Sequence, residues 1–103
     1  MGRARNGAMN TFEWDEEKNR ANQRKHGISF EEAATIFEGP VLSLEDEGHH
    51  SEVRERSYGL IGGVVAVCVV HTDRDGATRI ISARKATRNE RKHFDAYLQK
   101  AAG

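Results

Sequence analysis

Two arginines, a histidine and a glutamate in the second half of the chain have side chains suited to acid–base chemistry at a phosphate group: Arg56, Arg84, His71 and Glu90. Arginine stays protonated at any working pH, so Arg56 and Arg84 can stabilise negative charge but cannot act as a base. Histidine titrates nearest to neutral pH, which makes His71 a candidate acid or base. The alternative is that each arginine pairs with an acidic neighbour on a solvated sheet face.

Other residues compete for the acid–base role, and each has a second interpretation. His26 ends a predicted helix, where a positive charge would interact favourably with the helix dipole. His93 lies on the predicted closing helix among basic residues. Glu90 could act as a base near Arg84, which the short link of residues 85–87 permits. It is also the fourth residue of a capping box, and we favour this second role.

Neither the acidic loop nor the cysteine predicts a metal or redox site. Residues 45–50 read Glu-Asp-Glu-Gly-His-His, which are metal-ligand types, but adjacent residues rarely converge on one ion. We therefore interpret this segment as a solvated loop and expect no metal and no cofactor. Cys68 is the single cysteine and lies in an apolar run, so we expect a buried small side chain rather than a reactive thiol.

Two helices are predicted in the first half of the chain. Asp15 is a suitable N-cap for a helix over residues 16–26, and Gly27 is suited to end it. This helix is almost wholly polar, so neighbouring segments must hold it in place. A capping box at residues 29–32 opens a second helix, which residues 39–40 (Gly-Pro) end.

The remaining elements are strands and one more helix. Residues 11–14 alternate as a short strand does. Four further strands are expected over residues 41–44, 54–61, 64–71 and 78–85. Turn signals at residues 62–63 and 73–76 favour an antiparallel meander. A second capping box at residues 87–90 then opens the closing helix, and this order predicts an α+β fold.

The chain length favours a single domain, over residues 11–103. Residues 1–10 precede it and begin with a Gly/Arg-rich stretch that lacks apolar periodicity, so we predict a disordered extension there. No window has the apolar length of a membrane span, and no signal peptide opens the chain. We therefore expect a cytoplasmic protein without a membrane partner.

Side-chain alternation predicts where the two arginines point. On the last strand, Ile81 and Ala83 are assigned to the core side, so Arg84 points to the opposite face. Arg56 belongs to an earlier strand of the same meander, where it could share a groove with Arg84. His71 ends the central strand, a position from which a side chain can reach the rim of such a groove.

The formal net charge of zero conceals a split between the two halves of the chain. Residues 1–55 carry 7 Lys/Arg against 12 Asp/Glu, whereas residues 56–103 carry 9 against 4. The C-terminal half therefore has the charge of a phosphate binder. The alternative is that the two halves neutralise each other across the fold, so charge alone does not decide between them.

Two separated segments resemble the signatures of the BrnT toxin family, over a span from about residue 12 to residue 94. The matching positions are residues 12–15, Lys18, Asn22, residues 25–33, Glu55, Arg56, residues 79–87, Glu90 and Arg91. One departure concerns the closing helix. The family often has a tyrosine four residues after the glutamate that stands here as Glu90, but this chain has Phe94, and Tyr97 is too far along the helix to take that place.

The resemblance implies a RelE-like fold and a toxin of a type II toxin–antitoxin system that cleaves RNA without a metal and inhibits translation. It also implies a BrnA-like antitoxin with a ribbon-helix-helix part, a hetero-oligomer of the two proteins, and autorepression through operator DNA bound by that complex. We therefore predict Arg56, His71, Arg84 and Glu90 as catalytic residues, with the two arginines gripping the scissile phosphate. The predicted RNA-binding residues are Lys25, His26, Arg79, Lys85, Arg88 and Arg91.

Two other functions compete with the ribonuclease toxin. The first is a catalytically degenerate relative that only binds the antitoxin and co-represses its operon, and Phe94 is the residue that keeps it open. The second is a small DNA-binding regulator that uses its basic C-terminal helix. Against this second alternative, the chain has no recognisable helix-turn-helix spacing and no basic zipper.

Overall fold

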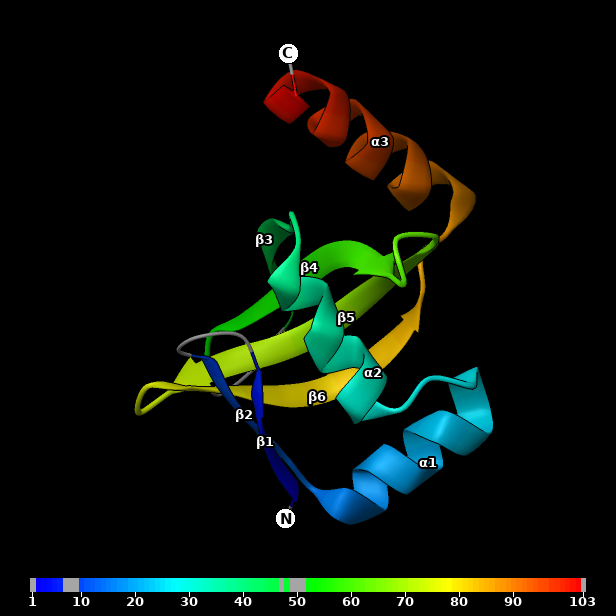
Figure 1. Ribbon diagram of the computed structural model, residues 1–103. Helices are drawn as coiled ribbons and strands as arrows, with labels where there is room; N and C mark the ends of the chain where they lie inside the picture. The colour runs from blue at the N-terminus through cyan, green and yellow to red at the C-terminus, as the bar shows by residue number, and fades with distance from the viewer. Residues whose placement is uncertain (1, 7–9, 47, 49–51, 103) are drawn as a thin grey trace.

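The computed structural model describes residues 2–6, 10–46, 48 and 52–102 (Figure 1). Its elements, in chain order, are β1 (Gly2–Asn6), β2 (Asn10–Trp14), α1 (Glu16–His26), α2 (Phe30–Ala34), the 3-10 helix η1 (Thr35–Glu38), β3 (Leu42–Asp46), β4 (Arg54–Ile61), β5 (Val65–Arg74), β6 (Ala77–Lys85) and α3 (Arg88–Ala102). The α+β class that the sequence predicts is confirmed.

The described strands form one mixed sheet in the order β1-β2-β6-β5-β4-β3. The predicted antiparallel meander is present as β3 to β6. The prediction left the short N-terminal strand outside the four-stranded antiparallel meander, whereas the sheet is mixed: β2 pairs in parallel with β6, and β1 pairs antiparallel with β2. Alternation identifies a strand from its side chains, but it does not tell which neighbour the main chain will pair with.

The N-terminal segment differs from the disordered extension predicted over residues 1–10. Gly2–Asn6 form β1, whose register with β2 runs from Gly2 opposite Trp14 to Asn6 opposite Asn10. An edge strand of this kind is held by main-chain hydrogen bonds, which require no apolar periodicity in its own side chains. The composition of the segment therefore carried no signal for the pairing.

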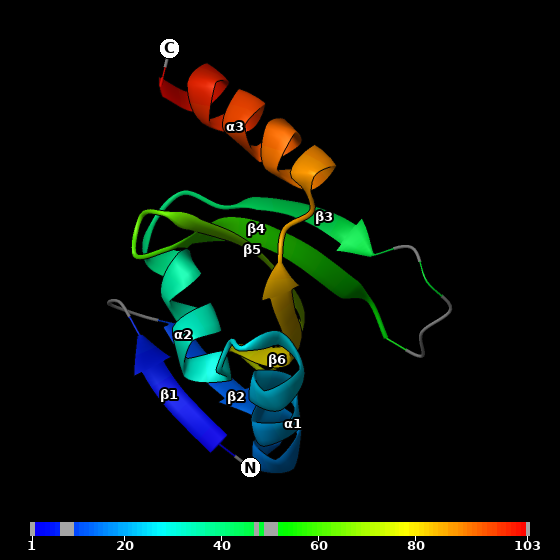
Figure 2. The same ribbon diagram turned by 90° about the vertical axis from the view of Figure 1, so that its right-hand side faces the viewer.

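The sheet has helices on both of its faces (Figure 2). One face, called here the α2 face, carries the main core, in which Phe12 and Trp14 of β2 and Val67 and Val69 of β5 pack against Phe30 and other residues of α2 and η1. The other face, called here the α3 face, carries a smaller cluster built around Phe94. Two faces covered by different helices explain why β5 is an almost continuous apolar strand.

Polar side chains hold helix α1 against the sheet, as its composition predicts. Asp15 caps it, accepting hydrogen bonds from the main-chain N–H groups of its first turn, and Gly27 ends it with φ of 73°. The buried Asn22 amide donates to the carbonyl of Ala83 (2.8 Å) and accepts from its N–H (3.1 Å). β2 pairs with β6 only as far as Arg79, so Asn22 satisfies main-chain groups farther along this strand.

A β-bulge in β6 changes the alternation on which the sequence prediction relied. Val70 of β5 lies opposite Ser82 and the next residue, His71, lies opposite Ile80, so Ile81 is an extra residue without a partner on β5. Ile80 and Ala83 are therefore both buried in the main core, whereas Ile81 was expected there in place of Ile80. The prediction for Ala83 is confirmed.

Gly59 of β4 permits a close approach of η1. A Cβ atom at this position would lie 2.7 Å from Cβ of Ile36, which is fully buried. We expect Gly59→Ala to lower the free energy of unfolding by about 1–3 kcal/mol, because the backbone must shift to admit the methyl group. Urea denaturation measures the change. Gly39→Ala is the matched control, since its Cβ would meet nothing within 4 Å; equal stabilities of the two variants would contradict this account.

Candidate active site

The candidate site lies on the α3 face, where the first turns of α3 meet β4. Phe94 is fully buried and clusters with Tyr58 of β4 and Cys68 of β5. Cys68 is itself fully buried, so the prediction of a structural cysteine is confirmed. This apolar cluster fixes the start of α3 over the sheet and thereby sets the position of Glu90, one helical turn earlier.

Glu90 and Arg84 form a bidentate ion pair. Nη1 of Arg84 donates to Oε1 of Glu90 at 2.7 Å, and Nη2 donates to Oε2 at 3.0 Å. This pairing of two planar groups is among the strongest that side chains form. Arg84 reaches Glu90 because it points to the α3 face, opposite to Ala83, as the alternation of β6 predicts.

Glu90 also closes the predicted capping box of α3. Its Oε1 accepts from the N–H of Thr87 at 2.8 Å, and its own N–H donates to Oγ1 of Thr87 at 3.2 Å. The carboxylate additionally accepts from the Tyr58 hydroxyl at 2.9 Å. Arg84 contributes most to lowering the pKa of Glu90 to about 2, against the opposing effect of burial. A carboxylate with this pKa and four hydrogen-bond donors is a poor general base.

Tyr58 connects this pair to Arg56. Its hydroxyl donates to Glu90 and accepts from Nη1 of Arg56 at 3.2 Å. Burial, followed by the hydrogen bond to Glu90, raises the pKa of Tyr58, so the phenol keeps its proton. Arg56 is half-buried and pairs with Asp46, whose carboxylate lies 3.7 Å from Nε. That Nε atom is buried and has no hydrogen-bond partner in the described part of the chain.

A pocket of about 340 Å³ opens beside these residues. It is lined by Leu42, Leu44, Arg56, Tyr58, Asn89, Glu90 and His93. Arg84 is not part of the lining, because its guanidinium is engaged with Glu90. The pocket therefore presents one incompletely hydrogen-bonded guanidinium and one imidazole to a ligand, with the Arg84–Glu90 pair supporting one wall.

The structure brings three of the four predicted catalytic residues together. Arg56, Arg84 and Glu90 lie on one face of the sheet and are linked through Tyr58. Both arginines also have the acidic neighbours that the alternative interpretation expects. The two interpretations are therefore compatible with one arrangement. Arg84 donates two hydrogen bonds to Glu90, whereas Nε of Arg56 has no hydrogen-bond partner in the described part of the chain.

His71 lies apart from this group, on the α2 face. It is opposite Glu55 of β4 and Ile80 of β6, and its ring packs edge-on against Phe37 of η1 at 5.3 Å between centroids. Only 4% of the residue is exposed, and burial lowers the pKa of its imidazole. His71 therefore does not reach the pocket beside Arg56.

The predicted RNA-binding residues fall on three elements. Lys25 and His26 end α1, Arg79 and Lys85 belong to β6, and Arg88 and Arg91 lie on the first turns of α3. Arg91 is paired with Asp95 at 3.0 Å. The exposed Lys85 and Arg88 flank the β6–α3 link close in sequence to Glu90, so these two positions extend the positive charge from the candidate site.

Sequence reasoning missed two of the polar residues that line the pocket, Tyr58 and Asn89. Tyr58 is two residues after Arg56 on β4, so the sequence predicts that both side chains point to the same face. The sequence does not indicate the hydrogen bond from Tyr58 to Glu90. Asn89 precedes Glu90 at the exposed start of α3 and carried no signal. His93 was among the histidines considered, and it does line the pocket.

Two other predictions concern metals and membranes. The loop over residues 45–50 lies partly outside the described residues, since Glu47, His49 and His50 are not among them. Within the described part of the chain, no helix has the length and apolar character needed to cross a membrane.

The fold and pocket define an α+β protein with a cationic site between its sheet and its last helix. The model of the family described as "Ribonuclease toxin, BrnT, of type II toxin-antitoxin system" matches residues 14–90. This chain therefore belongs to the BrnT family of ribonuclease toxins. The crystal structure of the Brucella abortus ribonuclease toxin BrnT is similar in fold, with a TM-score of 0.55 and 24% sequence identity over 73% of this chain and 94% of that chain. A search of curated proteins finds no match.

Proposed function

We propose that this toxin is an endoribonuclease that cleaves RNA without a metal ion, in the pocket beside Arg56. One observation carries the proposal: a half-buried guanidinium with an unsatisfied Nε lines a pocket together with the imidazole of His93. A phosphodiester offers the acceptor oxygens that such a guanidinium lacks.

The chemistry assigned to the pocket is attack of the ribose 2′-hydroxyl on its own phosphate, which forms a 2′,3′-cyclic phosphate and breaks the bond from phosphorus to the 5′-oxygen of the next nucleotide. Arg56 stabilises the charge that develops on the phosphorane, and His93 takes the proton of the 2′-hydroxyl and gives it to the leaving 5′-oxygen. Glu90 is assigned a positioning role rather than that of the base, since its pKa lies near 2 and four donors occupy its oxygens. Arg84 and Tyr58 in turn hold Glu90 and the start of α3 in place.

Exposed cationic side chains beside the pocket are assigned to binding of the RNA backbone. Lys85 and Arg88 are exposed on either side of the β6–α3 link. Phosphate contacts of this type are independent of base sequence and make binding sensitive to salt. Additional RNA contacts farther from the pocket are assigned to Lys25, His26, Arg79 and Arg91.

Membership of the family supports a proposal for the biological setting. We propose that a BrnA-like antitoxin with a ribbon-helix-helix part neutralises the toxin in a hetero-oligomer, that this complex represses its own operon, and that free toxin inhibits translation in the cytoplasm. A RelE-like fold and mechanism belong to the same proposal. The ribonuclease description of the family supports the RNA target.

Phe94 bears on the competing function, a degenerate toxin that acts only as a co-repressor. Its ring is fully buried and packs on Tyr97 at 6.2 Å between centroids, within the cluster under α3. A side chain in this position contributes packing, so a phenylalanine here is compatible with activity. We therefore favour the enzyme.

Incubation of the purified chain with RNA in excess EDTA tests the proposal. We expect cleavage to continue and to leave 2′,3′-cyclic phosphate ends, since these are the product of attack by the 2′-hydroxyl. Intact RNA from a chain that still binds its antitoxin tightly would contradict the enzyme and favour the co-repressor. Cleavage that requires an added divalent ion would contradict the metal-free mechanism.

A further inference from the structure

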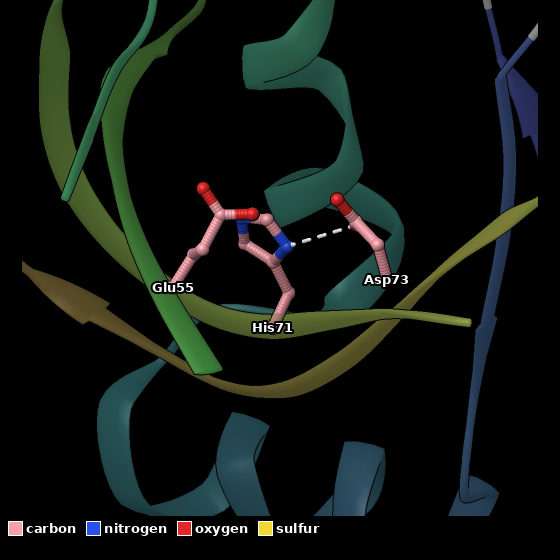
Figure 3. A group of neighbouring side chains, drawn as sticks. All are labelled: Glu55, His71 and Asp73. Atoms are coloured by element: carbon pink, nitrogen blue, oxygen red, sulfur yellow. Dashed lines mark ion pairs between the residues drawn. The ribbon is translucent and has the colours of Figure 1, made fainter. Parts of the chain in front are cut away.

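We propose that Glu55, His71 and Asp73 bind a divalent transition-metal ion such as Zn²⁺, at a site on the α2 face, away from the RNA pocket. One ligand atom from each residue lies within 4.8 Å of the other two. Figure 3 shows the Glu55 and Asp73 carboxylates on either side of the His71 imidazole. Carboxylate oxygen and imidazole nitrogen are standard zinc ligands.

Strand pairing places the three residues together. Glu55 of β4 is directly opposite His71 of β5. Asp73 is two residues beyond His71 on the same strand, so alternation brings its side chain to the same face. Because paired strands of the sheet supply all three side chains, their spacing does not depend on a loop.

His71 is held as a ligating imidazole is in metal sites. Its Nε2 is hydrogen-bonded to Oγ of Ser57 at 2.7 Å, and that hydroxyl is bonded to Oγ of Ser43 at 2.7 Å. In the tautomer that carries its proton on Nε2, the imidazole donates to Ser57 and the lone pair of Nδ1 is left for a ligand. Nδ1 is buried and has no hydrogen-bond partner in the described part of the chain.

Distances favour an ion shared between His71 and Asp73. Nδ1 of His71 lies 3.5 Å from Oδ1 of Asp73, longer than an ordinary N–H···O hydrogen bond. Two ligands at about 2.1 Å from one tetrahedral zinc ion are about 3.4 Å apart. The Asp73 side chain is 62% exposed, so it can turn toward an ion without a change in the core.

The local charge favours a cation. Glu45 of β3 lies directly opposite Glu55, and like charges at facing positions of an antiparallel pair destabilise it. In the described part of the chain, no hydrogen bond or ion pair joins Glu55 to a cationic side chain. A divalent ion would offset this acidic group.

The same residues could suggest a nucleophilic triad, since Ser57, His71 and Asp73 are in that spatial order. Ser57 has no solvent exposure, and its hydroxyl is bonded to Ser43. A substrate therefore cannot reach it. The serine acts instead as the partner that orients the imidazole.

The donor set selects the ion. A ligand set of one nitrogen and two carboxylates favours Zn²⁺ or a similar transition metal over Mg²⁺ and Ca²⁺, which prefer oxygen ligands alone. The proposed ion ties β4 to β5 and stabilises the fold. It is separate from RNA cleavage, so loss of one does not imply loss of the other.

Zinc titration of the full chain by calorimetry tests the site, with His49→Ala/His50→Ala as the background that removes the loop histidines. We expect one Zn²⁺ per chain, with Mg²⁺ at least 100-fold weaker. Asp73→Asn and Glu55→Gln should each weaken zinc binding at least tenfold. Glu52→Gln, whose carboxylate pairs with Arg74 outside the cluster, is the control and should bind normally.

Thermal unfolding provides a second readout. Zinc at 100 times its Kd should raise Tm by about 10 °C in the background protein, but not in Asp73→Asn. Unchanged zinc affinity in both Asp73→Asn and Glu55→Gln would overturn the site, as would binding that disappears in the loop-histidine background. RNA cleavage in EDTA is measured separately, so it can persist when zinc binding fails.

Discussion

Replacing Arg56 with alanine should lower the rate of RNA cleavage by about 10²–10³-fold, the usual cost of removing one preorganised donor to a developing negative charge. The fold should be little affected, because Arg56 pairs with Asp46 at 3.7 Å, and both side chains of this pair are partly exposed. Such pairs contribute about 0–1 kcal/mol to stability. Single-turnover cleavage of a fluorogenic RNA and thermal unfolding measure the two effects.

Two further variants make this experiment specific. Arg56→Lys keeps the charge but loses the forked donor geometry, so we expect an intermediate rate. Arg74→Ala removes an arginine that is also ion-paired, with Glu52 at 3.1 Å, but that lies outside the pocket, and its rate should match the unmodified protein. Equal losses in Arg56→Ala and Arg74→Ala would indicate a general charge effect and remove Arg56 from the site.

Side-chain alternation and capping signals were sufficient to predict half of the site. Alternation placed Arg84 on the face opposite to Ala83, membership of one meander suggested that Arg56 shares a groove with it, and the Thr87–Glu90 capping box located the start of α3. The face of His71 could not be obtained in this way. Its strand is apolar on both faces, so the sequence does not show by alternation of polar and apolar residues which face each side chain occupies. The bulge at Ile81 also changes the alternation of the neighbouring strand, β6.

Contacts between elements distant in sequence account for the rest. The Tyr58–Glu90 hydrogen bond spans 32 residues, and the Asn22–Ala83 contact spans 61. Glu90 and Asn22 are residue types that usually lie on the surface, so the sequence does not predict that they make these contacts. The pairing of β1 and β2 with the predicted meander was not predicted for a related reason, since it is made by main-chain groups.

The same contacts show why α1 bears on the site although it lies on another part of the molecule. Asn22 bonds both main-chain groups of Ala83, the residue immediately before Arg84. The segment from Ala83 to Glu90 is therefore fixed at both ends, by α1 at the first and by the Arg84–Glu90 pair at the second. The contacts of Glu90 therefore exist only in the folded protein. Their contribution to the free energy of unfolding can be measured by replacing Glu90.

Replacing Glu90 with glutamine should lower the free energy of unfolding by about 2 kcal/mol at pH 7, a loss that should disappear in acid. The folded-state pKa of Glu90, about 2, lies below the usual 4.5. The ionised carboxylate therefore stabilises the fold fully above about pH 4.5, and this contribution is lost as the pH falls toward 2. Each pKa unit corresponds to about 1.4 kcal/mol, and the partial exposure of the pair reduces the total.

Urea denaturation of both proteins at pH 7, 5, 4 and 3 gives the stability difference as a function of pH. Asp95→Asn is the control, because the Arg91–Asp95 pair is exposed and a helical pair of this kind contributes only about 0.3–0.5 kcal/mol. A Glu90→Gln deficit that stays constant down to pH 3 would show that glutamine disturbs packing rather than charge. A deficit that narrows with acidity would instead assign the stabilisation to the ionised carboxylate, which Arg84, Thr87 and Tyr58 hold together.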